Sequence, residues 1–248
     1  MLVTKYLYND VMIDLQYYIL NDNNIKKALS KKVIPVLKNN KIIKDPIIKT
    51  QQNIFIPREE DTLFWSFYIL KNGDIKYETL FNKNNIIERQ IKINYVDIIR
   101  KNKQILKPYK LDSISNIESN LANDKFINIK TFFALCVIEN INILYINNKT
   151  YYELIINDDN EITVLHCIDK KKYNTKYGFE KITNDNLNII KSTLYKVDNI
   201  DKPIKSISSY TVPLLVDMCK KLAIDIMNKE NGHQKSKKEL YESICLFF

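Results

Sequence analysis

Glycine is scarce in this chain, which has only three among its 248 residues, at positions 73, 178 and 232. Loops that cradle a nucleotide phosphate need several glycines close together, because the backbone must approach the phosphate without a Cβ atom in the way. The Walker A loop and the dinucleotide-binding fingerprint are therefore absent from the sequence, and P-loop or Rossmann chemistry is not expected.

Cysteine and histidine are too few and too scattered for a patterned metal site. The four cysteines form no C-x-x-C pair, and the chain has only two histidines. Cys136 and Cys219 lie in apolar helical patterns, where a thiol behaves as a small hydrophobic group. Tetrahedral zinc sites usually take closely spaced, paired ligands. We therefore expect no metal and no other cofactor.

Long hydrophobic runs are also missing. No apolar run approaches the ~20 residues that a membrane-spanning helix needs. The first ten residues are interrupted by Lys5, Asn9 and Asp10, which is unlike a signal peptide. These features predict an intracellular protein without a membrane partner.

Positive charge is in excess, with 38 Lys and Arg against 29 Asp and Glu and a formal net charge of +9. Such an excess favours anionic partners, among them nucleic acid, acidic protein surfaces and anionic lipid. A second explanation stays open, because the chain is rich in Ile, Lys, Asn and Tyr, the residues of AT-rich codons.

Hydrophobic periodicity predicts helices in the first half of the chain. Residues 1–37 have a helical pattern, and breakers in 38–57 indicate an extended connector. A strongly apolar helix is expected over 61–70, with Asp61 as its N-cap and Asn72-Gly73 as its end. Two or three short helices divided at Pro108 are expected within 85–123, and a second apolar helix over 129–140. The side chains predicted to be buried together are Leu63, Phe64, Phe67, Ile69, Phe132, Leu135, Val137 and Ile143.

Strands are expected over 141–146, 151–156 and 162–167, joined by hairpin turns at Asn147-Asn148 and at 158–160. Residues 170–178 are predicted to form a polar loop, and a linker is expected near 198–207. The fold class is therefore α+β, with helices packed on a small antiparallel sheet. We expect an N-terminal helical region (1–49) packed on a core domain (50–197), followed by a small two-helix module (205–248).

Three short strings in the core resemble the ovarian-tumour (OTU) type of papain-like deubiquitinase. Thr62-Leu63-Phe64-Trp65-Ser66-Phe67 is similar to the family's nucleophile string, Cys-Leu-Phe-x-Ser/Ala-Ile/Phe. Phe133-Ala134-Leu135-Cys136 followed by 141–144 is similar to its Ala-Leu helix and strand. Lys172-Tyr173-Asn174, after the strand 162–165, is similar to its closing His-Tyr-Asn motif. The resemblance covers roughly residues 50–178 and implies a papain-like core.

The departures from this family fall on the catalytic residues, because Thr62 stands at the cysteine position and Lys172 at the histidine position. A threonine hydroxyl needs a base to take its proton, and an ordinary lysine is cationic and cannot serve. Two catalytic alternatives stay open, Thr62 with Lys172 and Asn174, and Ser66 with His166. The resemblance otherwise implies a non-catalytic copy of a protease or deubiquitinase, with ubiquitin-like proteins among its partners.

The C-terminal segment predicts two helices joined by a loop with a basic cluster. Thr211 and Pro213 begin the first helix, whose apolar stripe is expected to be Leu214, Leu215, Met218, Cys219 and Leu222. The order of helix, glycine-containing loop, lysines and helix resembles SAP-type and Rho N-terminal-type nucleic-acid-binding modules. The resemblance implies that Lys235, Ser236, Lys237 and Lys238 contact phosphates, with Ser236 capping the helix while its amide meets a phosphate.

Together these features predict a non-catalytic nucleic-acid-binding or scaffolding protein, with DNA as the expected partner. The composition and the paired architecture resemble proteins of nucleocytoplasmic large DNA viruses, which implies viral protein partners and a location in the host cytoplasm or nucleus or in the virion. Two alternatives remain, a divergent protease or deubiquitinase and a structural virion protein.

Overall fold

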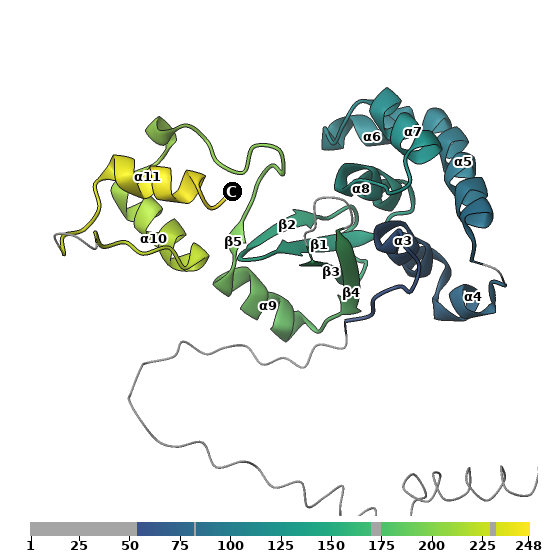
Figure 1. The fold of residues 1–248 in the computed structure, drawn as a ribbon, viewed down its shortest axis with the longest axis horizontal. Helices are drawn as coiled ribbons and strands as arrows, with labels where there is room; N and C mark the ends of the chain where they lie inside the picture. The colour runs from purple at the N-terminus through teal and green to yellow at the C-terminus, as the bar shows by residue number, and fades with distance from the viewer. Residues whose placement is uncertain (1–53, 82, 170–174, 229–231) are drawn as a thin grey trace, which may run out of the picture. The chain divides into compact units, whose positions relative to one another are not determined.

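The computed structural model describes residues 54–81, 83–169, 175–228 and 232–248, and Figure 1 shows how their elements are arranged. These residues belong to one compact unit. The predictions for the N-terminal region (1–49) and for most of the connector lie outside the described residues.

Helix α3 (Thr62–Asn72) is the central helix that the apolar segment predicts. Its N-cap is Asp61, whose carboxylate accepts a hydrogen bond of 3.1 Å from the amide of Phe64. It ends at Gly73, whose φ of 83° lies in the left-handed region that favours glycine. Both predicted ends of the helix are therefore confirmed.

The helices predicted within 85–123 and 129–140 are present, but the first of them is longer than expected and a helix at 74–79 was not predicted. Pro108 lies in the 3-10 turn η1, which separates a long helix, α5, from a shorter one, α7. Helix α8 matches the second apolar helix and is buried over most of its length. The bounds are α4 (Asp74–Thr79), α5 (Asn85–Lys101), α6 (Lys103–Leu106), η1 (Lys107–Tyr109), α7 (Ile114–Asn123) and α8 (Ile129–Ile138).

Five strands form one sheet in the order β4-β3-β1-β2-β5. The first three, β1 (Asn142–Asn147), β2 (Thr150–Leu154) and β3 (Ile162–Asp169), match the predicted strands. Strand β4 (Lys176–Lys181) begins inside the segment predicted to be a polar loop, so that prediction is wrong from residue 176 onward. The short strand β5 (Tyr195–Lys196) forms the other edge.

The α+β class is confirmed, but the sheet is mixed and not antiparallel. Strands β1 and β2 form the predicted antiparallel hairpin, whereas β3 pairs in parallel with β1 and the predicted second hairpin does not form. Asn142, which is buried, provides the physical reason. Its side chain accepts from the amide of Ile156 at 2.8 Å and donates to the carbonyls of Asn157 and Asn160, so the connection from β2 crosses the end of β1.

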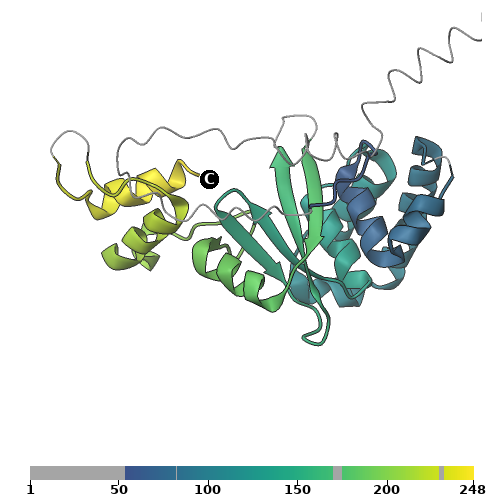
Figure 2. The same cartoon turned by 90° about the horizontal axis from the view of Figure 1, so that it is seen from below.

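The sheet separates two clusters of apolar side chains. Leu165 and Phe179 face the larger cluster, with α3 and α8, and all eight side chains predicted to be buried together lie in it. Val164 and Leu144 face the opposite way, toward Leu187 of α9 (Asn184–Thr193). Figure 2 shows α9 and the earlier helices on opposite sides of the sheet.

The C-terminal segment contains η2 (Ile207–Ser209), α10 (Val212–Leu222) and α11 (Lys237–Cys245), and these two helices have an apolar cluster of their own. The linker was expected near 198–207; no helix or strand occupies 198–206, and η2 begins at Ile207. None of the helices in the described part of the chain has the length and apolar character needed to cross a membrane.

Candidate functional site

Thr62, at the position of the family's cysteine, follows Asp61 at the start of α3. We call these two residues the corner of α3, because both side chains accept hydrogen bonds from distant segments. The side chain of Thr62 is buried, with 3% of its surface exposed, and its hydroxyl oxygen accepts a hydrogen bond of 2.9 Å from the amide of Tyr177 on β4. Asp61 beside it accepts from the amides of Phe64 and Ile127. Thr62 thus joins α3 to β4, which is a structural role.

A buried charge cluster lies directly behind this corner. Lys92 of α5 is 2% exposed, and its ammonium group donates to Asp61 Oδ2 and Glu88 Oε1, each at 2.7 Å, and to the carbonyl of Lys125 at 3.1 Å. The indole N–H of Trp65 donates to the other oxygen of Glu88. Burial raises the pKa of the Asp61 carboxyl, and the charge of Lys92 opposes that shift.

Sequence reasoning missed this cluster, because a lysine on an amphipathic helix is usually solvent-exposed. The one available signal was the Glu88–Lys92 spacing of four residues, which favours an ion pair on a helix surface. The cluster joins α3, α5 and the start of α8 through charged hydrogen bonds, so we assign it a structural role.

Ser66 and His166, the second predicted catalytic pair, are not brought together. Ser66 is fully buried, and its hydroxyl donates to the carbonyl of Thr62 at 2.7 Å, the usual bond of a serine inside a helix. His166 has the strand parity of Val164, so it lies on the α9 face of the sheet, where its Nε2 is 2.8 Å from Glu180 Oε1. The sheet therefore stands between His166 and α3. Lys172 and Asn174, the partners proposed for Thr62, lie outside the described residues.

Cys167 lines the largest pocket that we describe, with a volume of about 510 Å³. It has the opposite parity to His166, as strand geometry predicts, and it shares the pocket with Tyr145, Tyr152 and Tyr177. Burial raises the pKa of the Tyr177 hydroxyl to about 12 and that of Tyr145 further. The described lining contains no histidine, lysine or arginine, and its carboxylate, Asp201, forms an ion pair with Lys130 at 2.6 Å.

The start of α11 is the second candidate site, and its cap is more complete than the sequence predicts. Ser236 Oγ accepts from the amide of Glu239, and the Glu239 carboxylate accepts from the amide of Ser236 at 2.7 Å, which makes a capping box. We expected that amide to meet a phosphate, but Glu239 already binds it. Contacts with an anion at this site would therefore come from lysine side chains.

The lysines that precede and begin α11 are held in different ways. Lys235 is partly buried, and its ammonium group donates to Ser243 Oγ at 3.1 Å. Lys238 is exposed and lies 3.9 Å from Glu242, one turn further along the helix. Lys237 is the first residue of α11 and has no ion pair within the described part of the chain.

The two sides of the loop that joins the C-terminal helices, at 226–228 and 232–235, are paired like the sides of a hairpin. Met227 and Gln234 form an isolated antiparallel bridge, and the amide of Lys235 donates to the carbonyl of Ile226 at 3.0 Å. The basic residues at the start of α11 are thereby fixed to the preceding chain. One predicted core residue of the module is wrong: Leu214 is 53% exposed, because it lies beside the stripe formed by Leu215 and Met218.

Among the described residues, no group of three or more histidine, cysteine or acidic side chains could hold a metal ion. No protein-family model matches the chain, and no similar protein was found among the curated proteins or the solved structures. The resemblances to the OTU and SAP-type families therefore remain predictions.

Proposed function

We propose that this chain is a non-catalytic binding protein whose C-terminal module contacts the phosphate backbone of nucleic acid. The observation that carries the proposal is the start of α11, where three lysines lie within four residues on a capped helix that packs on α10. We call Lys235, Lys237 and Lys238 the tail lysines. They would supply charge, and the positive end of the α11 dipole would add to it.

The contacts within the core support a binding role over a catalytic one. The hydroxyl groups of Thr62 and Ser66 both take part in structural hydrogen bonds, and His166 faces the other side of the sheet. A nucleophile needs a base within hydrogen-bond reach, and the described residues place none beside either hydroxyl. The core would then serve as a scaffold for the C-terminal module.

The tail lysines can be tested by changing all three to alanine in the full chain. Binding to a mixed-sequence DNA duplex is expected to weaken, and the slope of log affinity against log salt is expected to become shallower by about 2 to 3, since each neutralised phosphate releases counterion. Fluorescence anisotropy at several salt concentrations measures both. Discrimination among sequences should be slight, because phosphate contacts do not read bases.

A matched triple separates a specific site from diffuse basicity. Lys76, Lys149 and Lys181 are exposed, have no ion pair within the described residues, and lie on α4, the β1–β2 turn and the end of β4. We call them the control lysines. Changing them to alanine removes the same charge as changing the tail lysines. Equal losses of duplex affinity and of salt dependence in the two triple variants would contradict the proposal.

The alternative function, a divergent protease or deubiquitinase, predicts a covalent reaction that the binding proposal does not. We expect a ubiquitin-based electrophile to leave the chain unlabelled, because neither Thr62 nor Ser66 has a base in reach among the described residues. Measurement of the intact mass shows whether the chain is labelled. Labelling that disappears in Thr62→Ala, Ser66→Ala or Cys167→Ala would overturn the proposal and identify the nucleophile.

A further inference from the structure

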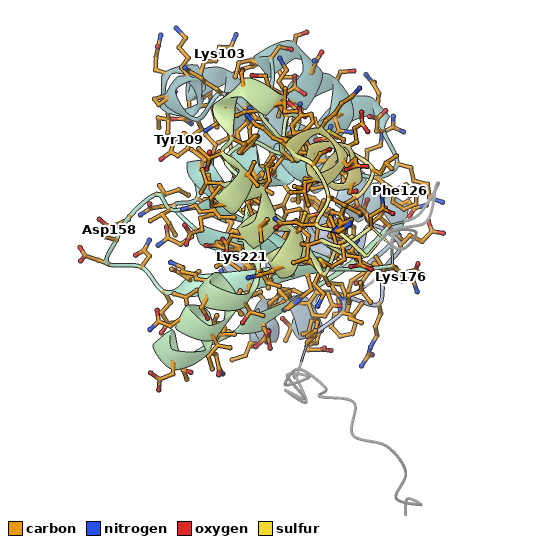
Figure 3. All side chains as sticks on the ribbon, turned by 90° about the vertical axis from the view of Figure 1, so that its left-hand side faces the viewer. Lys103, Tyr109, Phe126, Asp158, Lys176 and Lys221 are labelled. Atoms are coloured by element: carbon orange, nitrogen blue, oxygen red, sulfur yellow. The ribbon has the colours of Figure 1, made fainter. Side chains whose placement is uncertain are left out.

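A second basic surface lies far along the sequence from the tail lysines, at the end of α5 and through α6 and η1. Residues 101–111 contain four lysines and no acidic residue. All four lysines, at positions 101, 103, 107 and 110, are exposed. None of them forms an ion pair within the described part of the chain. Figure 3 shows Lys103 at the periphery of the structure.

Three of these lysines follow one another along a short stretch of largely helical backbone. Lys103 and Lys107 are four residues apart, a spacing that makes two residues neighbours on one helix face. Lys110 follows the 3-10 turn η1 as its C-cap residue. The three backbone positions span roughly 10 Å, and we call Lys103, Lys107 and Lys110 the lysine row.

The segment beneath the row is firmly attached to the core. Leu106 is buried in the larger apolar cluster. Ile99, seven residues earlier, is fully buried in the same cluster. The side chain of Asn102 donates to the carbonyl of Ile98 at 2.8 Å, which fixes the junction between α5 and α6. A row on an anchored segment loses little conformational freedom on binding, which favours affinity.

The acidic residues around the row already have other partners. Arg100 binds Glu118 at 3.1 Å, and Asp112 accepts from Asn116 and Ser113. Asp198 and Asp201 line a cavity with Lys110, but each forms an ion pair elsewhere. The positive charge of the row is therefore not balanced from within the described residues.

Lys110 also adopts a backbone conformation that lysine does not favour. Its φ of 48° and ψ of 41° lie in the left-handed region, where glycine or asparagine would be less strained. Glycine would adopt this backbone conformation without strain.

We propose that the lysine row is a second binding surface for the phosphate backbone of nucleic acid, separate from the tail lysines. Phosphates along one strand of a duplex are about 3.4 Å apart along its axis, so a row of this length spans about three of them. A membrane surface fits less well, because Leu106 is buried in the core and Ile105, 49% exposed, is a single apolar side chain and not an apolar helix face that could enter lipid. The proposal does not depend on the tail lysines, and it uses no base-reading group.

Changing the lysine row to alanine in the full chain tests the proposal against the same duplex. The slope of log affinity against log salt is expected to become shallower by about 2 to 3, and affinity at low salt to fall roughly tenfold or more. The control lysines, changed in the same way, should have a clearly smaller effect on both. Equal effects of the two triples would overturn the proposal, whatever the tail triple does.

Lys110→Gly provides a variant that keeps the fold. It removes one charge and relieves the left-handed backbone, so the denaturant midpoint should stay level or rise while the salt slope becomes shallower by about 1. Binding to vesicles of phosphatidylserine and phosphatidylcholine is measured for the same variants, to distinguish nucleic acid from lipid. Loss of vesicle binding in the row triple, with duplex binding unchanged, would assign the row to lipid and overturn the proposal.

Discussion

Replacing Lys92 by methionine is expected to lower the free energy of unfolding by about 3–5 kcal/mol. The ammonium group of Lys92, which is 2% exposed, places its three donors on Asp61, Glu88 and the carbonyl of Lys125. Methionine has a similar length but no charge, so two carboxylates would be left without their counterion. Urea unfolding, followed by tryptophan fluorescence at Trp65, measures the change.

A matched ion pair on the surface serves as the control. Lys125 is 2.6 Å from Glu60, and about 60% of both side chains is exposed, so Lys125→Met should cost about 1 kcal/mol or less. Adding Asp61→Asn to Lys92→Met should recover part of the loss, because asparagine keeps an acceptor for the helix cap without a charge. Similar losses for Lys92→Met and Lys125→Met would contradict the buried charge cluster.

Truncation of Phe64 or Phe67 to alanine is expected to have an equally large effect, about 3–5 kcal/mol each. Both side chains are at most 1% exposed. The ring of Phe64 lies edge-on to Trp65 with centroids 5.7 Å apart, and that of Phe67 lies edge-on to Tyr95 at 5.1 Å. Each truncation leaves a cavity between α3 and the helices around it, which the rigid neighbours cannot fill.

Phe81→Ala is the same chemical change at a site that is 88% exposed, so it should change the free energy of unfolding by about 0.5 kcal/mol or less. Denaturant midpoints of the three variants, measured side by side, test the assignment of the core. If Phe64→Ala and Phe67→Ala unfold at the same denaturant concentration as Phe81→Ala, α3 is not the centre of the fold.

The sequence was most informative where one local signal determines the structure. The carboxylate of Asp61 and the left-handed Gly73 specify both ends of α3, and continuous apolar character identified α3 and α8 as buried. The hairpin between β1 and β2 was equally local, since Asn148 adopts the positive φ that its turn needs. These elements depend on few distant contacts.

Strand pairing and β4 could not be predicted in this way, because they depend on distant contacts. The parallel arrangement of β3 beside β1 depends on Asn142 and the backbone of the following connection. Strand β4 has a polar sequence, but Phe55 pairs with its residue Phe179. Gly178 makes this possible, because a Cβ there would lie 2.9 Å from the carbonyl oxygen of Phe55.

In the candidate site, too, features set by local sequence were predicted and features set by distant contacts were not. Ser236 was expected to cap α11, without the reciprocal bond to Glu239, and the opposite orientations of His166 and Cys167 follow from strand parity. The use of the Ser236 amide by Glu239, the contact of Thr62 with Tyr177 and the burial of Lys92 all depend on tertiary packing. The three lysines of the lysine row are visible in the sequence, but that they form no ion pair among the described residues required the structure.

The most direct test of the central claim, that this is a binding protein for the nucleic-acid backbone, is the salt dependence of duplex binding by the unchanged full chain. The tail lysines and the lysine row together predict a log–log slope of about −4 to −6, little preference among sequences, and a shallower slope when either triple is removed. A chain that does not bind the duplex at low salt, or whose affinity is independent of salt, would contradict the account.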